Sequence, residues 1–147
     1  MTVPQEAYDL ARAFEGLRLE PYHDVAGFPT IGYGTLLSRE RGADLSKWRP
    51  TTEAEAEAAL TSHLTRSAKS VVNLCPVPLT IGQFSALIDF AFNLGSGSLQ
   101  ASTLRRCVNR GDMLGAIEQF GRWVYAGGVK FPGLVRRRQA EVRVFES

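Results

Sequence analysis

The chain has 147 residues, of which 44% are hydrophobic and 22% are charged, and it contains 14 glycines and 7 prolines. This composition is typical of a soluble globular protein and excludes a disordered, collagen-like or low-complexity chain. A chain of this length buries roughly 68 to 70% of the surface that its unfolded form exposes, which is enough for a core without disulfide or metal staples. One domain, folded as two lobes, is therefore expected.

The first segment and the cysteines indicate where the protein is made. No apolar run approaches the roughly 18 residues that a spanning helix needs, and the N-terminal segment carries charges, so neither a signal peptide nor a membrane anchor is expected. Cys75 and Cys107 have no Cys or His partner at metal-ligand spacing. We therefore expect two buried thiols in a protein made in a reducing compartment, with no metal site.

Charge is distributed unevenly along the chain. Residues 1–100 contain 8 Lys and Arg against 11 Asp and Glu, a sum of −3, whereas residues 101–147 contain 9 against 4, a sum of +5. A basic C-terminal third attracts polyanions. Charge alone does not distinguish nucleic acid from the phosphate-rich polymers of a bacterial envelope.

The first predicted element is a helix over 3–15. Apolar residues recur at three- and four-residue spacing between Ala7 and Leu17, and Thr2 with Gln5 has the form of a capping box. Gly16 is placed to end this helix.

A small sheet lobe is predicted next, over about 17–50. Gly and Pro punctuate short runs of β-branched and aromatic residues up to Leu37, which favours two or three short antiparallel strands. Thr52 and Glu55 then form a second capping box, which opens an alanine-rich linking helix over about 52–74.

The remaining residues, about 79–147, are predicted to form a helical lobe together with the first helix. Thr80 with Gln83 caps a helix through Phe92, and further helices are expected near 99–109, 113–120 and 133–145. Strands and helices that do not alternate indicate an α+β fold. A sheet lobe and a helical lobe joined by a long helix would leave a cleft, which is where ligands usually bind.

Two carboxyl groups lie in contrasting predicted environments. Glu15 stands at the C-terminal end of the first helix among apolar neighbours, which favours its protonated form. Asp24, nine residues later, lies in the turn-like HDVAG, where a carboxylate stays hydrated and ionised, and Thr30 follows six residues on. Such a pair is typical of glycoside hydrolysis. A chain with 15 acidic residues offers many pairs at this spacing, however, so the spacing alone does not establish the function.

Longer stretches carry a more specific signal. FEGLRLEPYHDVAGFPTIGYG resembles the catalytic segment of the phage-type lysozymes, with its Glu, Asp and Thr at the same spacing and its TIGxG strand. FAFNLGSGSLQASTLRR and RWVYAGGVKFPGLVRRRQAE are similar to helical-lobe segments of the lambdoid branch, so the resemblance covers essentially the whole chain. It implies a lysozyme-like fold and an endolysin. Such a muramidase hydrolyses the β-1,4 bond between N-acetylmuramic acid and N-acetylglucosamine in peptidoglycan and lyses the host cell.

The resemblance also assigns roles to residues. Glu15 falls where the family has its general acid, and Asp24 and Thr30 fall where it positions and activates a water, which implies an inverting mechanism. Glycines in the strand motif would let a polysaccharide approach the sheet closely. The substrate-binding positions implied in this way are Gly32, Gly34, Leu36, Phe92, Asn93 and Thr103. No cofactor is implied.

Two departures from the family pattern have consequences. Thr35 stands where many relatives have His, so a structural ion pair of those relatives is expected to be missing. The chain also lacks the signal-anchor helix of some lambdoid endolysins. This implies synthesis in the host cytoplasm and action on the periplasmic cell wall after release by a holin, as a monomer with no nucleic-acid partner and no stable membrane insertion.

Other polar and aromatic residues have simpler interpretations. His23 either tunes Asp24 or is a solvated turn residue. Trp123 is expected mainly to pack in the core. The consecutive arginines 136–138 cannot all face the core, because successive helix positions are about 100° apart, so one is expected to pair with an internal acid, with Glu15 as a candidate.

Two other functions remain open at the level of sequence. A lytic transglycosylase would attack the same polymer with one Glu and no catalytic Asp, and the presence of Asp24 and Thr30 argues against it. A non-catalytic module that binds envelope or nucleic acid would explain the basic third of the chain. It would not explain the set of Glu15, Asp24 and Thr30.

Overall fold

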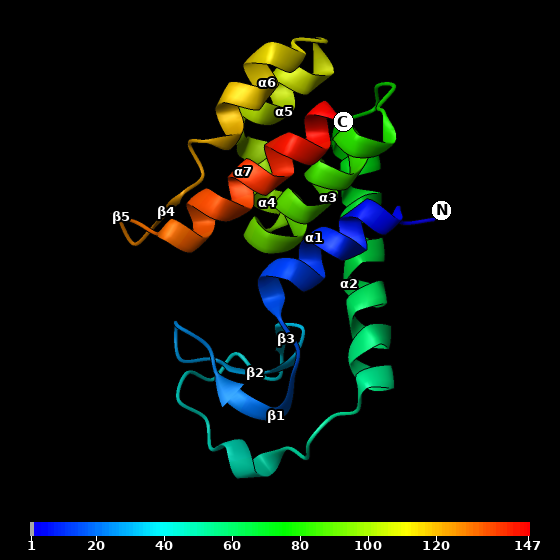
Figure 1. Ribbon diagram of the computed structural model, residues 1–147. Coiled ribbons are helices and arrows are strands. Elements are labelled where there is room, and N and C mark those ends of the chain that lie inside the picture. The colour runs from blue at the N-terminus through cyan, green and yellow to red at the C-terminus, as the bar shows by residue number, and fades with distance from the viewer. Residues whose placement is uncertain (1) are drawn as a thin grey trace. The chain divides into compact units, whose positions relative to one another are not determined.

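The computed structural model describes residues 2–147, which divide into two compact units. One unit consists of residues 11–63, and the other consists of residues 2–10 and 64–147. Figure 1 labels the helices and strands of both. Helices predominate and the sheet is small and antiparallel, as an α+β fold requires. Within the described residues, no helix combines the length and the apolar character needed to cross a membrane.

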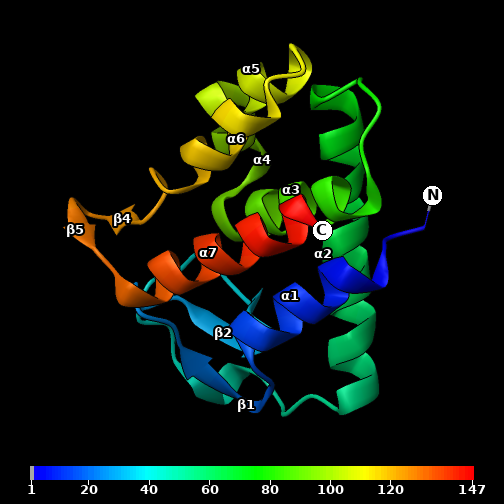
Figure 2. The ribbon, with the colours of Figure 1, turned by 45° about the horizontal axis from the view of Figure 1, so that its top comes forward.

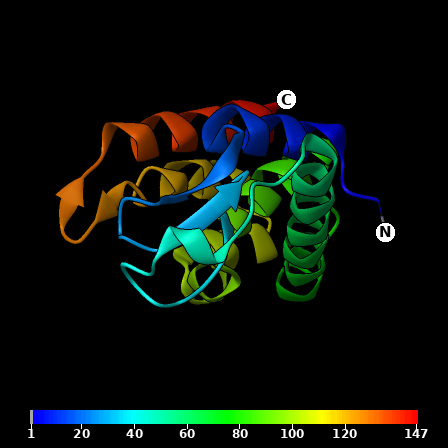
Figure 3. The same ribbon diagram turned by 90° about the horizontal axis from the view of Figure 1, so that it is seen from below.

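The unit of residues 11–63 holds a three-stranded antiparallel sheet in the order β1-β2-β3 (Figure 3). Tyr22 on the first strand lies opposite Thr30 on the second, which lies opposite Leu36 on the third. The elements of this part of the chain are α1 (Gln5–Glu15), β1 (Arg18–His23), β2 (Pro29–Gly32), β3 (Thr35–Leu36), a 3-10 turn (Leu45–Lys47) and the start of α2 (Glu53–Leu74). The predicted short strands and the linking helix are confirmed.

Local signals set the ends of these helices. Helix α1 ends at Glu15 because Gly16 adopts a left-handed conformation with φ +66°. The Thr52 hydroxyl caps the start of α2 by accepting a hydrogen bond from the Glu55 N–H at 3.1 Å. The capping box predicted at Thr2 is wrong. Helix α1 begins only at Gln5, because the proline at position 4 disfavours a helical conformation of Val3 before it. The Gln5 side chain donates to Asp9 instead of to the Thr2 backbone.

The larger unit is built around two long helices, α3 and α7, which lie side by side, while α5 packs on α6 (Figure 2). Aromatic side chains fill its core: the Phe90 and Phe120 rings meet edge to face at 5.8 Å, and Trp123 meets Phe90 at 5.4 Å. Trp123 therefore packs as predicted. The elements are α3 (Ile81–Leu94), α4 (Ser96–Ala101), α5 (Thr103–Asn109), α6 (Met113–Phe120), β4 (Tyr125–Ala126), β5 (Val129–Lys130) and α7 (Pro132–Glu146).

The larger unit departs from the prediction in two places. The helix expected near 99–109 is two helices, α4 and α5, because the Ser102 hydroxyl accepts from the Arg105 N–H at 3.0 Å and starts a new helix. The β4–β5 hairpin was not predicted. Its turn is formed by Gly127 and Gly128, both with positive φ, as a tight hairpin requires.

Two predicted local features of the larger unit are confirmed. Thr80 and Gln83 form a complete capping box at the start of α3. Cys75 and Cys107 are both buried free thiols, and burial raises the pKa of the Cys75 thiol.

The contact between α3 and α7 generates a test of the fold. A Cβ on Gly82 would lie 2.2 Å from the Val144 carbonyl oxygen, so Gly82→Ala should lower the free energy of unfolding by about 1–3 kcal/mol. Gly97→Ala, at a helical glycine with nothing within 4 Å of its Cβ, is the matched control and should be neutral or stabilising by about 0.5–1 kcal/mol. Urea denaturation measures both, and equal stabilities would contradict the close approach.

Candidate active site

Six of the nine predicted site residues lie in the unit of residues 11–63. Glu15 is the last residue of α1, Asp24 follows β1 and Thr30 lies on β2. The other members of this group are Gly32, Gly34 and Leu36, around the turn between β2 and β3. The remaining three predicted residues, Phe92, Asn93 and Thr103, belong to the larger unit.

The Glu15 carboxyl group lies directly against the backbone of Gly34. A Cβ on Gly34 would be 3.0 Å from Glu15 Oε2 and 3.3 Å from the carboxyl carbon. Gly34 also has φ +77°, a conformation that side chains disfavour. The space beside this glycine is therefore filled by the chain's own carboxyl group. At Gly32 the space is filled by the methyl group of Ala56 instead, which a Cβ would meet at 3.3 Å.

The Asp24 carboxylate is held by a tight turn. The Asp24 N–H donates to the Phe28 carbonyl at 2.9 Å, and the Phe28 N–H donates to Asp24 Oδ1 at 2.8 Å. The second oxygen, Oδ2, makes no hydrogen bond with any of residues 2–147. One face of the carboxylate is thus fixed by the backbone, while the other remains able to accept a proton from a water.

Thr30 is the buried member of this group, with 3% of its surface exposed. Its hydroxyl donates to the Phe28 carbonyl at 2.9 Å. Because the hydroxyl proton is used in this bond, the oxygen can act only as a hydrogen-bond acceptor toward a further partner. Phe28 therefore links Asp24 and Thr30, because its N–H donates to Asp24 and its carbonyl accepts from Thr30. His23 directs its Nε2 to the Ala43 carbonyl at 2.8 Å, which ties the end of β1 to the following loop.

Tyr22 lies among these groups and was missed by the sequence analysis. The pKa of its phenol is raised, first by burial and then by the negative charge of Glu15, with a smaller contribution from Asp24. Arg18, whose guanidinium carbon is 4.2 Å from the ring centroid, acts in the opposite direction and lowers the pKa of Tyr22. Both carboxylates therefore act on one phenol, which stands opposite Thr30 in the sheet.

An ion pair fixes the helical turn that precedes Glu15. The Arg12 guanidinium donates to both carboxylate oxygens of Glu57, at 3.0 and 2.7 Å, and so joins α1 to α2 within the unit. The Arg12 hydrogen bond lowers the pKa of the Glu57 carboxyl group. This bidentate pair restrains the end of α1, from which Glu15 projects.

In the larger unit, two consecutive arginines of α7 bind side chains of α3. Arg137 makes a bidentate ion pair with Asp89, at 2.9 and 2.8 Å, and its guanidinium carbon is 5.9 Å from the Phe92 ring centroid. Arg138 donates to Asn93 Oδ1 at 2.7 Å. The expected internal ion pair of the arginine run is thus confirmed. Thr103, the remaining predicted residue, accepts a hydrogen bond from Arg106 at 2.7 Å.

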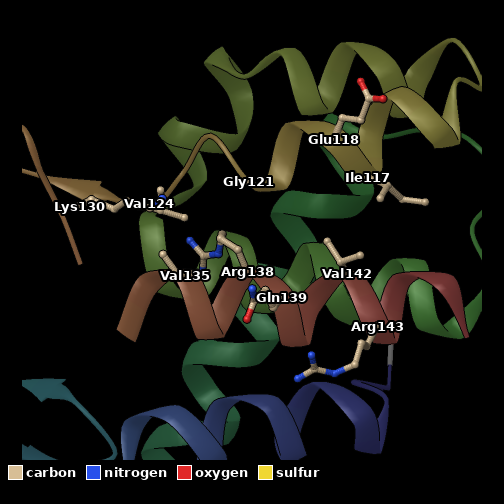
Figure 4. A pocket seen from close by; sticks show the side chains of 10 residues that line it. All are labelled: Ile117, Glu118, Gly121, Val124, Lys130, Val135, Arg138, Gln139, Val142 and Arg143. Carbon is tan, nitrogen blue, oxygen red and sulfur yellow. The ribbon is translucent and has the colours of Figure 1, made fainter. Parts of the chain in front are cut away.

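A pocket of about 570 Å³ opens in the larger unit between α6, the β4–β5 hairpin and α7 (Figure 4). Its walls are mainly apolar, and the buried Arg138 lies in one of them. Glu118 is the single carboxyl group among the described lining residues. Glycoside hydrolysis in most enzyme families uses two carboxyl groups, whereas this lining contributes one, so the region of Glu15 and Asp24 is the better candidate for that chemistry.

Comparison with known proteins gives these residues a context. The model of the phage lysozyme family matches residues 12–141. The chain belongs to this family. It is 39% identical over 127 residues to the SAR-endolysin of Bacteriophage PS119, which covers 86% of this chain and 73% of that relative. It is also 35% identical over 145 residues to the endolysin of Bacillus phage B103. That alignment covers 99% of this chain but only 54% of the relative.

Solved structures of lysozymes share the fold. An endolysin from Escherichia coli O157:H7 phage FAHEc1 matches with a TM-score of 0.87 and 32% identity, over 99% of this chain and 93% of that one. The muramidase domain of SpmX from Asticaccaulis excentricus matches with a TM-score of 0.84 and 31% identity, over 99% and 98%. The α+β prediction and the resemblance to phage-type lysozymes are both confirmed.

The contact of Glu15 with Gly34 can be tested in this lysozyme. Gly34→Ala should reduce kcat by about tenfold or more, because the new methyl group displaces the Glu15 carboxyl group. Gly42→Ala is the matched control, since Gly42 has a similar φ of +74° but no atom within 4 Å of its Cβ. Both variants carry the same backbone strain, so equal losses of kcat would show that the strain, and not the contact, causes the effect.

Proposed function

We propose that this chain is an endolysin in which Glu15 is the general acid and Asp24 with Thr30 holds and activates the attacking water. As a member of the phage lysozyme family it is a glycoside hydrolase that acts on bacterial peptidoglycan. The observation that carries the residue assignment is the turn at Phe28, whose N–H donates to Asp24 and whose carbonyl accepts from Thr30. Glu15 lies in the same unit, against the backbone of Gly34.

The proposed reaction is a direct displacement. The Glu15 carboxyl group gives its proton to the glycosidic oxygen as the bond from that oxygen to C1 of N-acetylmuramic acid breaks. A water attacks C1 from the opposite face of the sugar. Thr30 accepts a hydrogen bond from this water, because its own proton is engaged by the Phe28 carbonyl, and Asp24 takes the proton that the water loses. The products are a free hydroxyl group and a reducing end.

The route to the substrate is also part of the proposal. We infer that the protein acts as a monomer on the periplasmic cell wall after a holin releases it, in line with its resemblance to lambdoid endolysins. The exposed Arg106 and Arg110 support an attraction to the anionic envelope, since both lie in the basic C-terminal third. Substrate contacts are proposed for Gly32, Gly34, Leu36, Phe92, Asn93 and Thr103.

The catalytic assignment predicts the effect of removing the acid. Glu15→Gln should lower the rate of peptidoglycan hydrolysis by about 10²- to 10⁴-fold, because no other group supplies the proton to the leaving oxygen. The variant should fold normally, as shown by circular dichroism. Activity above about a tenth of that of the wild type would contradict the assignment, since general acid catalysis contributes more than this.

The role of Asp24 and Thr30 predicts the stereochemistry. If water attacks C1 directly, the first product has the inverted, α configuration at the new reducing end, which NMR detects before mutarotation. Retained configuration would show a covalent intermediate and contradict the roles of both residues. A 1,6-anhydro end would instead identify a lytic transglycosylase.

A further inference from the structure

The pocket between α6, the β4–β5 hairpin and α7 takes no part in the proposed reaction. Its volume of about 570 Å³ lies within the range of small-molecule binding sites. The described lining residues all lie within 117–143, so the pocket belongs to the larger unit alone. None of Glu15, Asp24 and Thr30 is among them. A ligand in this pocket would therefore be bound by one unit without any group assigned to catalysis.

The two ends of the pocket differ in character (Figure 4). Lys130 and the guanidinium group of Arg138 lie toward the hairpin, whereas Ile117 and Val142 lie at the opposite end. Val135 and Val142 line the pocket seven positions apart on α7, which is about 10 Å at 1.5 Å per residue. The pocket is thus elongated along one helix, with a cationic end and an apolar end.

Arg138 is buried in the wall of the pocket, and its hydrogen bonds do not use all of its five N–H donors. Nη2 donates to Asn93 at 2.7 Å and to Glu141 at 2.8 Å. Nη1 donates only to the Trp123 carbonyl, at 3.4 Å, so one of its two N–H groups has no acceptor among residues 2–147. A buried donor without an acceptor lowers the free energy of unfolding.

The charges around Arg138 are also incompletely balanced. Arg137 is paired with Asp89, and the carboxyl group of Glu141 hydrogen-bonds to the same Asp89. Burial first, and then the bond to Asp89, raise the pKa of Glu141 well above its usual range and favour its protonated form. Two arginines then face one carboxylate, which leaves a positive charge in the wall of the pocket. Buried charges without a counter-charge are costly.

The exposed part of the lining has the same sign of charge. Lys130 and Arg143 are exposed and cationic, and Glu118 is the single carboxyl group among the described lining residues. With Arg138, the lining contains three cations and one carboxyl group. A low-dielectric pocket with this excess of positive charge attracts anions.

We propose that this pocket binds an amphipathic anion of the fatty-acid class, with its carboxylate toward Arg138 and Lys130 and its alkyl chain along α7 between Val135 and Val142. The inference goes beyond the proposed function and does not depend on it. The carboxylate supplies the missing counter-charge and acceptor, and the chain removes the apolar wall from water. Because such a ligand binds only the folded chain, it stabilises the larger unit.

Octanoate is the probe, used below the concentration at which it forms micelles. Calorimetric titration should show saturable binding with a Kd at or below about 1 mM. Butyrate keeps the carboxylate but has a shorter chain, and should bind at least about tenfold more weakly. Octanol keeps the chain without the charge and should bind at least about threefold more weakly. Absence of saturable octanoate binding up to about 10 mM, or equal binding of octanol, would overturn the proposal.

Val142→Phe tests the apolar end, because the larger side chain fills the space proposed for the alkyl chain. Val142 is half-buried, and the variant should raise the Kd for octanoate at least about tenfold. Leu114→Phe is the matched control, since Leu114 is 80% exposed on α6 and lies outside the described lining. The control should leave the Kd unchanged. Equal effects of the two substitutions would place the ligand elsewhere.

Two exposed lining residues of opposite charge test the cationic character of the pocket. Lys130→Gln should raise the Kd for octanoate about threefold and Glu118→Gln should lower it about threefold. Arg122→Gln, at an exposed arginine outside the described lining, should have no effect. A general loss of folding cannot produce changes of opposite sign. Changes of the same sign, or none, would overturn the role of charge. Arg138 is left intact because its loss would deprive Asn93 and Glu141 of their partner.

A sedimentation experiment distinguishes a free fatty-acid anion from an assembled membrane. Wild type and Val142→Phe are mixed with phosphatidylglycerol vesicles, and the protein that sediments with them is measured. Equal sedimentation of the two proteins is expected, because the pocket takes up a single free anion. Sedimentation that Val142→Phe abolishes would show that the pocket recognises the membrane, and would overturn the assignment to a free anion.

Discussion

The ion pair between Arg137 and Asp89 constrains how the two long helices of the larger unit pack against each other. It joins the middle of α3 to α7, residues 48 positions apart in the chain, and it is bidentate and almost fully buried. Loss of one partner would leave an uncompensated charge in the core, at a cost of about 3–5 kcal/mol. The close approach of Gly82 to Val144 belongs to the same helix pair, while Phe90 extends the core from α3 to Phe120 of α6.

The unit of residues 11–63 is organised differently, by contacts that are local in sequence. Asp24 and Thr30 both bond to Phe28, and a left-handed glycine ends α1 at Glu15. The proposed catalytic groups therefore lie within 16 consecutive residues, 15–30, and their arrangement follows from turn and strand chemistry. This locality is the reason why one stretch of sequence is enough to suggest the activity.

Sequence reasoning succeeded where a structure depends on neighbouring residues. The capping box at Thr80 needs only Gln83, and it is complete in the structure. The same rule failed at Thr2, where the proline at position 4 decides the start of the helix, and Ser102 was overlooked as a cap inside an apolar stretch. The β4–β5 hairpin was missed because strands of two residues carry no periodicity.

The site shows the same limit. Glu15, Asp24 and Thr30 were found because a family motif spans them, whereas Tyr22 emerged only from the pairing of two strands. The contact between Arg138 and Asn93 joins positions 45 residues apart, and a single sequence contains no signal for such a pair. Contacts of this kind depend on how helices pack against each other. The periodicity of a sequence indicates which face of a helix is buried, but it does not indicate what that face meets.

The burial of Cys75 bears on how its sulfur responds to oxidants. Oxidation and thiol exchange require the thiolate, and the raised pKa of Cys75 keeps its sulfur protonated and out of reach of solvent. If the protein reaches the periplasm as proposed, a change of redox potential around it leaves this buried thiol unreacted.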